Sequence, residues 1–447
     1  MRGTIGGTPY NNLTPIDLVE MTSAYAAWLI KNNAAKKVVI GRDGRISGEI
    51  VSQIVMSTLR SMGIDVIDVG YSTTPSIEML VPKENAGGGI ILTASHNPKE
   101  WNALKLLNSK GEFISKKDGE DLLSMAEEKS FEFANVNNLG RLETRKEDFD
   151  FHIEKILALP YLNLDLIKSR KYKVVVDCIN STGSISIPPL LKKLDCEFVL
   201  INEQLTGEFA HNPEPVPENL KQLSEAVVTH KADLGIAVDP DVDRLVFVCE
   251  DGSMFSEEYT IVAVSEFILK HKPGHTVSNL SSTRALADIT VAAGQKYYAS
   301  AVGEVNVVEK MKAVNAVIGG EGNGGVILPD LHYGRDALVG IALMLNHLAE
   351  EEITLSTLKK RYPEYHIIKT KVQLSQGTDV DSLLNKLKNH YLEERINEED
   401  GIKVDFADGW VHLRRSNTEP IIRIIAESKS IDEANKLIKN VQNIING

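Results

Sequence analysis

Three aspartates spaced by single residues are the strongest chemical signal in the sequence. Asp239, Asp241 and Asp243 stand in the segment Asp-Pro-Asp-Val-Asp-Arg, directly after the apolar run 234–238. Carboxylates at positions i, i+2 and i+4 of a loop can converge on one hard metal cation. An EF-hand calcium loop needs glycine at its sixth position, which here holds Arg244. We predict a metal site, and the alternative is a polar turn whose carboxylates cap backbone amides.

The segment Thr-Ala-Ser-His-Asn-Pro around Ser95 could supply a nucleophile. It follows the apolar run 89–93, and α/β sheets place their ligands at the carboxyl ends of strands. His96 stands next to Ser95 and could activate its hydroxyl, although neighbours in sequence need not face each other. A Ser-x-Asn-Pro run is also common in turns and helix caps, so these residues alone leave both interpretations open.

Donors suited to a phosphate gather near the C-terminus. The run Arg-Arg-Ser-Asn-Thr at 414–418, with Arg423 beyond it, offers guanidiniums, hydroxyls and an amide in one short stretch. A solvated basic turn is the alternative interpretation. The glycine-rich segments 41–45 and 319–325 let backbone amides approach a ligand closely. The sequence contains no Gly-x-x-x-x-Gly-Lys-Ser/Thr loop, which argues against ATP as a phosphoryl donor.

Short apolar runs that alternate with amphipathic stretches must position these loops. The apolar runs predict strands, and the 3.6-residue periodicity of the stretches between them predicts helices. Predicted strands are 37–40, 65–69, 89–93, 173–177, 197–201, 234–238 and 276–280; predicted helices are about 48–62, 184–194, 257–270, 284–294 and 336–348. After about residue 365 the strands 367–374, 410–413 and 421–426 alternate with helices at 380–391 and 432–445. We predict three similar mixed α/β domains with mostly parallel sheets, followed by a smaller α+β domain.

The bulk composition narrows the class of protein. A length of 447 residues suggests three or four domains, and the net charge of −13 argues against a general basic surface for nucleic acid. Three scattered cysteines, Cys178, Cys196 and Cys249, read as reduced buried thiols. No uncharged apolar stretch approaches the ~18 residues of a membrane span, and no apolar signal core begins the chain. We expect a cytoplasmic protein without a membrane or nucleic-acid partner.

Taken together and in this order, the four loops resemble the α-D-phosphohexomutase family, most of all its phosphoglucosamine mutases and its archaeal-type phosphomannomutase/phosphoglucomutases. The resemblance extends over nearly the whole chain. It implies an intramolecular phosphotransferase that interconverts hexose 6-phosphate and hexose 1-phosphate through a phosphoserine and a sugar bisphosphate. It also implies one Mg²⁺ per active site and a hexose 1,6-bisphosphate as activator and intermediate. Four domains would surround a central cleft: a phosphoserine domain (1–143), a metal-binding domain (144–249), a sugar-recognition domain (250–363) and a C-terminal phosphate-binding domain (364–447).

The same resemblance assigns roles to individual residues. Ser95 matches the phosphoserine, whose phosphate completes the metal site of Asp239, Asp241 and Asp243. Lys105, in Asn-Ala-Leu-Lys, matches a lysine implicated in proton transfer, with His96 nearby, and Arg244 matches the arginine after the metal ligands. Substrate-binding matches are Arg2, Arg42, Glu321, Asn323, Arg414, Ser416, Asn417, Thr418 and Arg423, and Arg45 belongs to the same loop as Arg42.

Two departures from the family pattern affect the expected substrate and N-terminus. Family members usually carry a longer N-terminal segment, whereas here Met1 stands directly before Arg2, so the true start could lie upstream. The sugar loop reads Glu-Gly-Asn-Gly-Gly where many members have Glu-x-Ser-Gly-His. We expect glucosamine 6-phosphate as substrate, with mannose or glucose phosphate as the alternative. An inactive sugar-phosphate-binding protein and a phosphatase with an Asp nucleophile are weaker alternatives, and we expect a monomer or a homodimer.

Overall fold

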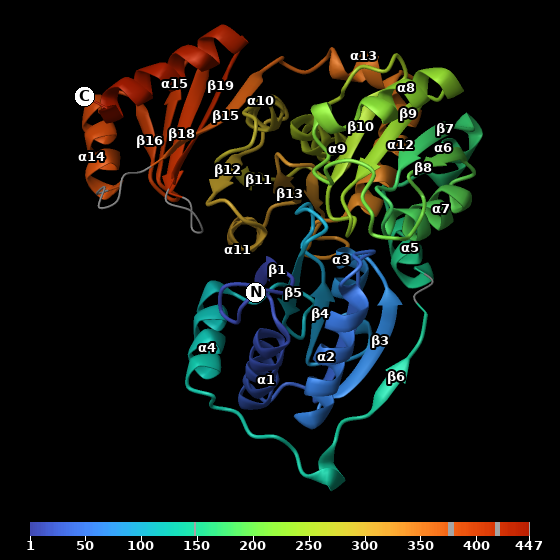
Figure 1. The fold of residues 1–447 in the computed structure, drawn as a ribbon. Helices are drawn as coiled ribbons and strands as arrows, with labels where there is room; N and C mark the ends of the chain where they lie inside the picture. The colour runs from blue at the N-terminus through green and yellow to red at the C-terminus, as the bar shows by residue number, and fades with distance from the viewer. Residues whose placement is uncertain (147–148, 374–379, 416–420, 447) are drawn as a thin grey trace. The chain divides into compact units, whose positions relative to one another are not determined.

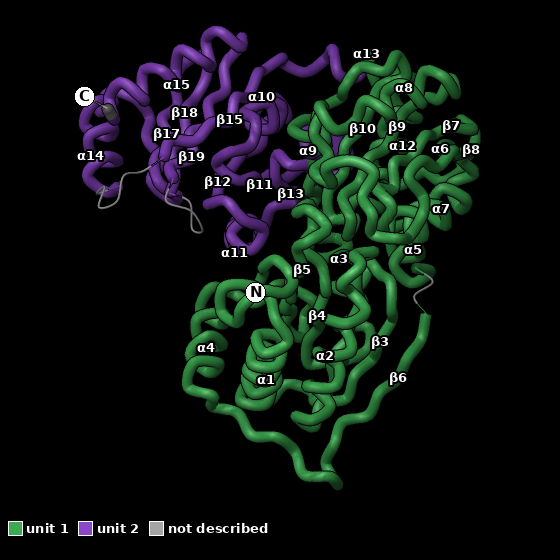
Figure 2. The backbone as a smooth tube through the Cα atoms, viewed as in Figure 1, with its two compact units in different colours: residues 1–260, 324–356 green, residues 261–323, 357–447 purple. Residues whose placement is uncertain are grey.

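The computed structural model describes residues 1–146, 149–373, 380–415 and 421–446 (Figure 1). The chain divides into two compact units, shown in different colours in Figure 2. The first comprises residues 1–260 and 324–356, and the second comprises residues 261–323 and 357–447. Both units therefore contain segments that are discontinuous in the sequence.

The first unit opens with a six-stranded sheet in the order β1-β5-β4-β2-β3-β6. Strands β4, β2, β3 and β6 are parallel, and β5 runs antiparallel between β4 and β1. The strand bounds are β1 (Arg2–Thr4), β2 (Lys37–Arg42), β3 (Asp65–Tyr71), β4 (Gly88–Leu92), β5 (Trp101–Leu107) and β6 (Leu142–Thr144). The helices are α1 (Pro15–Lys31), α2 (Gly48–Ser61), α3 (Thr74–Lys83) and α4 (Lys116–Glu127).

Both faces of this sheet are covered, because successive side chains of a strand point to opposite faces. On β2, Val38 and Ile40 pack with residues of α1, α2 and α4, whereas Val39 between them packs with α3. This double coverage explains why the central strands read as continuous apolar runs in the sequence.

The second sheet of this unit has the order β10-β9-β7-β8, with β10 antiparallel to β9 and the other pairs parallel. Its strands are β7 (Lys173–Asp177), β8 (Glu197–Ile201), β9 (Leu234–Val238) and β10 (Leu245–Cys249). The helices are α5 (Asp150–Leu157), α6 (Leu164–Arg170), α7 (Gly183–Lys193) and α8 (Lys221–His230). Strand β14 (Gly325–Ile327) and α12 (Ala337–Glu351) complete the unit, and the buried α12 packs against α5, α6 and α7.

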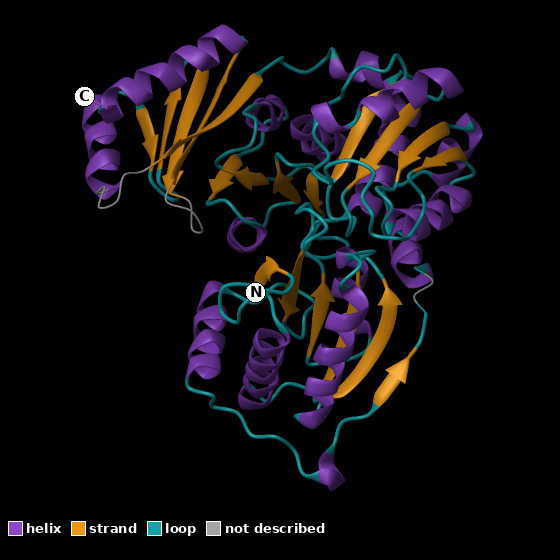
Figure 3. Ribbon diagram, in the orientation of Figure 1, coloured by secondary structure: helices purple, strands orange, loops and turns teal. Residues whose placement is uncertain are grey.

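The second unit contains a parallel group of strands, β12-β11-β13, and an antiparallel C-terminal sheet in the order β15-β19-β18-β17-β16. Figure 3 shows α15 lying along the C-terminal sheet. The first group comprises β11 (Thr276–Asn279), β12 (Tyr297–Ser300), β13 (Ile318–Glu321), α10 (Ala285–Ala292) and α11 (Glu304–Val314). The C-terminal group comprises β15 (His366–Gln373), β16 (Arg395–Asn397), β17 (Ile402–Phe406), β18 (Gly409–Arg415), β19 (Ile421–Ser428), α14 (Val380–His390) and α15 (Ile431–Asn446). The chain passes between units within α9 (Glu257–His271), between residues 323 and 324, and within α13 (Leu355–Lys359).

The predicted fold class is confirmed: three α/β groups with mostly parallel strands precede a smaller domain with an antiparallel sheet. The three cysteines are buried, as expected, and no disulfide joins them in the part of the chain that the structure describes. In the part of the chain that the structure describes, no helix has the length and apolar character to cross a membrane.

Tyr25 provides a test of how the N-terminal sheet is held against α1. Its hydroxyl is buried and donates to the carbonyl of Leu107 at 2.6 Å. We predict that Tyr25→Phe lowers the free energy of unfolding by about 1–2 kcal/mol, because a buried acceptor loses its donor. Urea unfolding followed by circular dichroism measures this change. Tyr10→Phe is the control, since Tyr10 is 73% exposed; equal midpoints for the two variants would contradict the prediction.

Candidate active site

The acidic loop lies at the carboxyl end of β9 and leads back into the antiparallel β10. Its turn requires Val242 to adopt a φ of +61°, a left-handed conformation that is rare for a β-branched residue. The turn places carboxylate oxygens of Asp239, Asp241 and Asp243 within 4.8 Å of one another, and all three side chains are fully buried. Burial and the charges of Asp241 and Asp243 together raise the pKa of Asp239 well above its usual range.

Cations from other segments balance this negative charge. Lys105 Nζ on β5 lies 2.6 Å from Asp241 Oδ2 and 2.8 Å from Asp243 Oδ2. Arg335 Nη2, just before α12, lies 2.8 Å from Asp243 Oδ2. Burial alone would lower the pKa of Lys105, but the two carboxylates outweigh burial and raise it. Lys105 is therefore a fixed positive charge beside the acidic loop.

The donor set of the acidic loop fits a hard dication. Asp241 Oδ1 and Asp243 Oδ1 are buried, and neither accepts a hydrogen bond from the described residues. A buried carboxylate oxygen without a partner is costly unless a cation or water satisfies it. Oxygen ligands of this kind are those that Mg²⁺ prefers. The three carboxylates could therefore hold a magnesium ion.

Ser95 lies directly against the acidic loop. Its Oγ donates to Asp239 Oδ2 at 2.6 Å. The residue has a φ of +51°, which is uncommon outside glycine and occurs where surrounding structure holds a functional residue. The backbone N–H of Ser95 donates to Thr93 Oγ1 at 2.9 Å, and that hydroxyl donates to Asp43 Oδ2 at 2.6 Å. The hydroxyl of Ser95 and the three carboxylates thus share one buried site.

Arg45 holds the loop that carries Ser95. Its side chain is fully buried, and Nε lies 3.0 Å from Asp43 Oδ2. The guanidinium donates to main-chain carbonyls of the same loop, those of Ser95, Asn97, Pro98 and Trp101. The resemblance had placed Arg45 only in a loop near the site. The structure shows that this arginine holds the loop that carries Ser95.

The other predicted residues of this unit also lie near the acidic loop. His96 Nδ1 is 3.4 Å from Ser95 Oγ, and burial together with the charges of Arg244 and Arg2 lowers the pKa of His96 to about 2. The backbone N–H of Arg244 donates to Asp239 Oδ1 at 3.1 Å. Arg2 Nη1 on β1 donates to Asn97 Oδ1 at 2.9 Å. The imidazole of His96 is therefore neutral, and in this state of the site it is a weak base.

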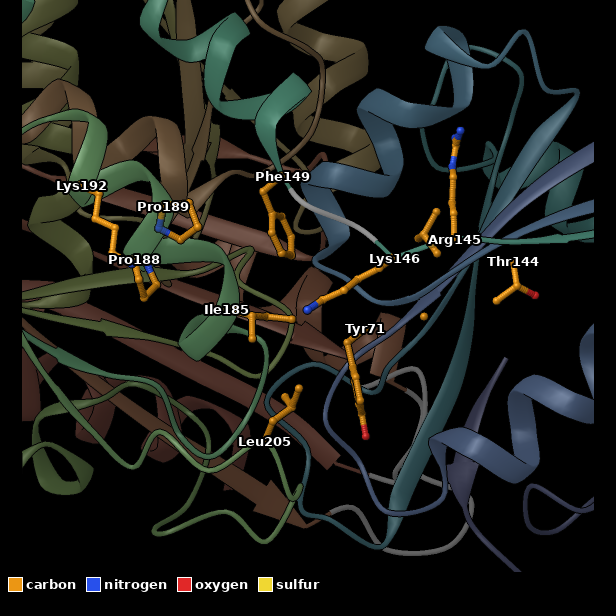
Figure 4. Close-up of a pocket in the computed structure, with 12 residues that line it drawn as sticks. Tyr71, Thr144, Arg145, Lys146, Phe149, Ile185, Pro188, Pro189, Lys192 and Leu205 are labelled. Atoms are coloured by element: carbon orange, nitrogen blue, oxygen red, sulfur yellow. The ribbon is translucent and has the colours of Figure 1, made fainter.

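Arg42 has a different environment. Its guanidinium lies over the ring of Tyr71, 3.9 Å from the ring centroid. Tyr71 also lines a cavity of about 1070 Å³, together with Lys146, Phe149, Ile185 and other residues shown in Figure 4. None of the predicted site residues is among the residues that line this cavity. The cavity is thus separate from the site around Ser95.

Two predicted sugar-loop residues lie in the second unit, at the end of β13. Glu321 is buried, and its Oε1 accepts from Asn279 Nδ2 at 2.8 Å and from the backbone N–H of Gly303 at 3.2 Å. Asn323 Nδ2 lies 3.5 Å from Glu321 Oε2. The buried carboxylate of Glu321 is therefore fixed in orientation by its neighbours.

The C-terminal arginines form an unusual pair in the same unit. Arg414 on β18 and Arg423 on β19 are direct cross-strand partners. Like charges directly opposite each other in a sheet are destabilising, so this pair favours a bound anion. Arg414 Nη1 lies 3.7 Å from Asp400 Oδ2, which offsets part of the repulsion. The predicted residues Ser416, Asn417 and Thr418 lie outside the described residues.

Two residues at the acidic loop were missed in the sequence analysis. Thr74, at the start of α3, donates from Oγ1 to Asp241 Oδ2 and from its backbone N–H to the Asp241 carbonyl at 2.9 Å. Arg335 is the other. The Thr-Thr-Pro pattern at 73–75 signals a helix start, and helix starts bind anions, so that signal was available for Thr74. Arg335 had no comparable local signal.

Family models cover nearly the whole chain. The phosphoglucomutase/phosphomannomutase models match alpha/beta/alpha domain I at residues 1–133, domain II at 150–252, domain III at 256–365 and the C-terminal domain at 369–444. The chain belongs to this family, the α-D-phosphohexomutases. It is therefore a mutase, an isomerase that transfers phosphoryl groups, and the predicted family is confirmed. Enzymes of this family use Mg²⁺, for which the acidic loop has the ligands.

Similar proteins carry two kinds of name. A phosphoglucomutase/phosphomannomutase of Thermococcus kodakarensis is 37% identical over 98% of this chain and 96% of its own length. A phosphoglucosamine/phosphogalactosamine mutase of Sulfurisphaera tokodaii is 32% identical over 100% of this chain and 99% of its own. The crystal structure of a phosphoglucomutase/phosphomannomutase family protein from Burkholderia thailandensis superposes with a TM-score of 0.86 at 26% identity, covering 100% of this chain and 95% of that one.

Arg45 provides a test of loop positioning. We predict that Arg45→Lys lowers kcat about 100-fold, because an ammonium cannot replace the planar guanidinium that fixes several carbonyls, and small misplacement of a reacting group is costly. Steady-state kinetics with a hexose phosphate and circular dichroism measure activity and folding. Arg60→Lys is the control, since Arg60 Nε donates to the Gly140 carbonyl at 3.1 Å, away from Ser95. Wild-type kcat in Arg45→Lys would contradict this role.

Proposed function

We propose that this mutase interconverts hexose 6-phosphate and hexose 1-phosphate through a phosphate carried on Ser95, with glucosamine 6-phosphate as its substrate. The observation that carries the proposal is the contact of Ser95 Oγ with Asp239 Oδ2 at 2.6 Å inside a buried cluster of carboxylates. Ser95 is buried beside the carboxylates and adopts a left-handed backbone conformation, and such conformations cluster at functional sites.

A phosphate on Ser95 requires positive charge around it. Phosphoserine adds a charge of about −1.5 to −2 at neutral pH. Asp239, Asp241 and Asp243, together with one phosphate oxygen, would hold a magnesium ion. When bound, this ion neutralises charge on the phosphoryl oxygens during transfer. Lys105 and Arg335 contribute fixed cations beside Asp243.

The phosphoryl group moves in two transfers. A sugar hydroxyl, at C1 or C6, forms a bond to phosphorus while the bond from phosphorus to Ser95 Oγ breaks. The proton of the sugar hydroxyl passes to a base, and Ser95 Oγ regains a proton. His96 Nδ1 lies 3.4 Å from Ser95 Oγ, and this distance supports it as the group that exchanges this proton. The negative charge of a phosphate on Ser95 would raise the pKa of His96, which burial and two arginines lower in its absence. The resulting bisphosphate turns end for end, and its other phosphate returns to Ser95.

The second unit would bind the parts of the sugar phosphate that do not react. We assign the phosphate that is not being transferred to Arg414 and Arg423, whose mutual repulsion a dianion would relieve. Ser416, Asn417 and Thr418 remain predicted ligands of the same phosphate. Glu321 and Asn323 would contact the sugar, and the buried carboxylate of Glu321 suits an ammonium as well as a hydroxyl. Arg2 and Arg42 remain predicted substrate ligands.

Mannose or glucose phosphate is the second candidate substrate. The relative of Thermococcus kodakarensis, at 37% identity, carries the name phosphoglucomutase/phosphomannomutase. Relatives whose names include phosphoglucosamine mutase, at 32% identity, support glucosamine phosphate as the substrate. The two substrate classes differ by an amine or a hydroxyl at C2, so a few contacts decide between them.

Replacement of Ser95 tests the relay. We predict that Ser95→Ala lowers kcat at least ~10³-fold, because no hydroxyl remains to carry the phosphoryl group. Intact-mass spectrometry with peptide mapping should find a phosphate-sized adduct on Ser95 in the wild type and none in the variant. Ser124→Ala is the control, because Ser124 is exposed on α4. Full activity in Ser95→Ala would exclude the mechanism.

Comparison of substrates tests the assignment of the sugar. We predict that kcat/KM for glucosamine 6-phosphate exceeds kcat/KM for mannose 6-phosphate and glucose 6-phosphate by at least about tenfold, since a C2 ammonium gains an ionic contact with a carboxylate. Assays primed with the corresponding 1,6-bisphosphate measure the three ratios. A higher kcat/KM for mannose 6-phosphate or glucose 6-phosphate, which lack the C2 amine, would favour that sugar phosphate as the substrate. Glu321→Gln should reduce the preference, because it removes the charge and keeps the side-chain shape.

A further inference from the structure

A second cluster of metal-binding side chains lies in the first unit, apart from Ser95. His152 on α5, His332 before α12 and Asp336 at the start of α12 place ligand atoms within 4.8 Å of one another. His152 Nε2 is 2.7 Å from Asp336 Oδ2, and His332 Nε2 is 3.2 Å from the same oxygen. Two imidazole nitrogens and one carboxylate oxygen therefore converge on one point.

We propose that His152, His332 and Asp336 bind a zinc-type transition-metal dication with a structural role. Zinc binds two imidazoles and one carboxylate in proteins when a water molecule takes the fourth position, and a water would complete this site. Magnesium prefers oxygen ligands alone, so the acidic loop and this cluster select different metals. The site lies outside the reacting atoms and adds to the proposed function without depending on it.

In both imidazole rings, the nitrogen that does not face the cluster, Nδ1, contacts a polar side chain, as in established metal sites. His152 Nδ1 is 2.9 Å from Ser76 Oγ, and His332 Nδ1 is 3.3 Å from Glu78 Oε2, both on α3. Histidines that bind metals almost always have their other ring nitrogen held by a carboxylate, carbonyl or similar group. These contacts aim each Nε2 at the point of convergence. The proposed ligands thus have the outer contacts that a metal site requires.

Asp336 is held in the same way. Its Oδ1 accepts from the backbone N–H groups of Leu338 at 2.8 Å and Val339 at 3.2 Å, as the N-cap of α12. This capping leaves Oδ2 to face the two imidazoles. The carboxylate is fully buried, whereas the side chain of His332 is 13% exposed, which leaves a route for a metal ion.

Charge balance admits two states of the cluster. Glu78 and Asp336 bring two negative charges into a buried region. A dication at the cluster would balance these charges, and a proton on His332 offsets one of them in its absence. Burial lowers the pKa of His332, but the two carboxylates outweigh it and raise the pKa to about 10. A metal ion must therefore displace protons, and its binding has a measurable proton release.

The proposed metal would connect the segments that surround the acidic loop. Helix α3, which holds the two histidines through Ser76 and Glu78, also donates from Thr74 to Asp241. Arg335, between the two ligands of the α12 segment, contacts Asp243. The N–H of Ala337 donates to the Val242 carbonyl at 3.2 Å. A metal at the cluster would therefore hold in place the donors that balance the three carboxylates.

Metal analysis of the full chain tests the proposal. The protein is incubated with one equivalent of zinc, dialysed against excess Mg²⁺ to occupy the acidic loop, and analysed by plasma mass spectrometry. We expect one zinc ion per chain in the wild type. His332→Gln and His152→Gln should each weaken zinc binding about 100-fold or more, and Ser76→Ala about tenfold. His211→Gln is the matched control, because His211 Nε2 is 2.9 Å from a single carboxylate, Asp177.

Two measurements on the wild type test the metal site without any variant, so they apply even if a variant fails to fold. Cobalt(II) in place of zinc should give the visible absorption of a low-coordinate site with nitrogen ligands, and zinc titration in weakly buffered solution should release protons. A wild type that retains no zinc, or zinc binding that is equal in His332→Gln, His152→Gln and the wild type, would overturn the proposal. The cluster would then be a hydrogen-bonded network of the two histidines with Asp336.

Discussion

The repulsion among three buried carboxylates within five residues is the constraint on which the site depends. Asp239, Asp241 and Asp243 lie together without solvent, so their charge must be met by cations at short range. The chain meets it with Lys105 from the N-terminal sheet and Arg335 from the segment that precedes α12. The fold therefore brings two distant segments to one loop, and a metal ion would complete the balance.

Two residues at the same place adopt a backbone conformation that is uncommon outside glycine. Ser95 and Val242 both adopt positive φ values, and each is held by contacts from elsewhere in the fold. Arg45 fixes the first loop through main-chain carbonyls, and the N–H of Ala337 bonds to the carbonyl of Val242 in the second. Such conformations persist only where the surrounding structure over-determines a residue. The geometry of Ser95 is thus a property of the whole unit and not of its own segment.

Local regularity explains how well the elements were predicted. The strands expected at 173–177 and 234–238 coincide with β7 and β9, because strands buried on both faces are continuous apolar runs. Helix α1 and strands β1, β5 and β6 are among the elements that the sequence analysis did not predict. Strands β1 and β6 are only three residues long, and β1 and β5 take their place from pairing with residues distant in sequence. Pairing of this kind has no signature within the strand itself.

The sequence by itself determined which groups could do chemistry: an acidic triplet, a serine after a strand and a cluster of arginines. Their type and spacing are local properties, and the order of the loops is enough to indicate the family. Only the tertiary structure decided which groups meet. It placed Ser95 on Asp239, turned Arg45 inward as a support for the loop, and set Arg414 opposite Arg423. It also brought His152 to Asp336 across 184 positions of the chain, because burial and charge pairing act through space and leave no mark on neighbouring residues.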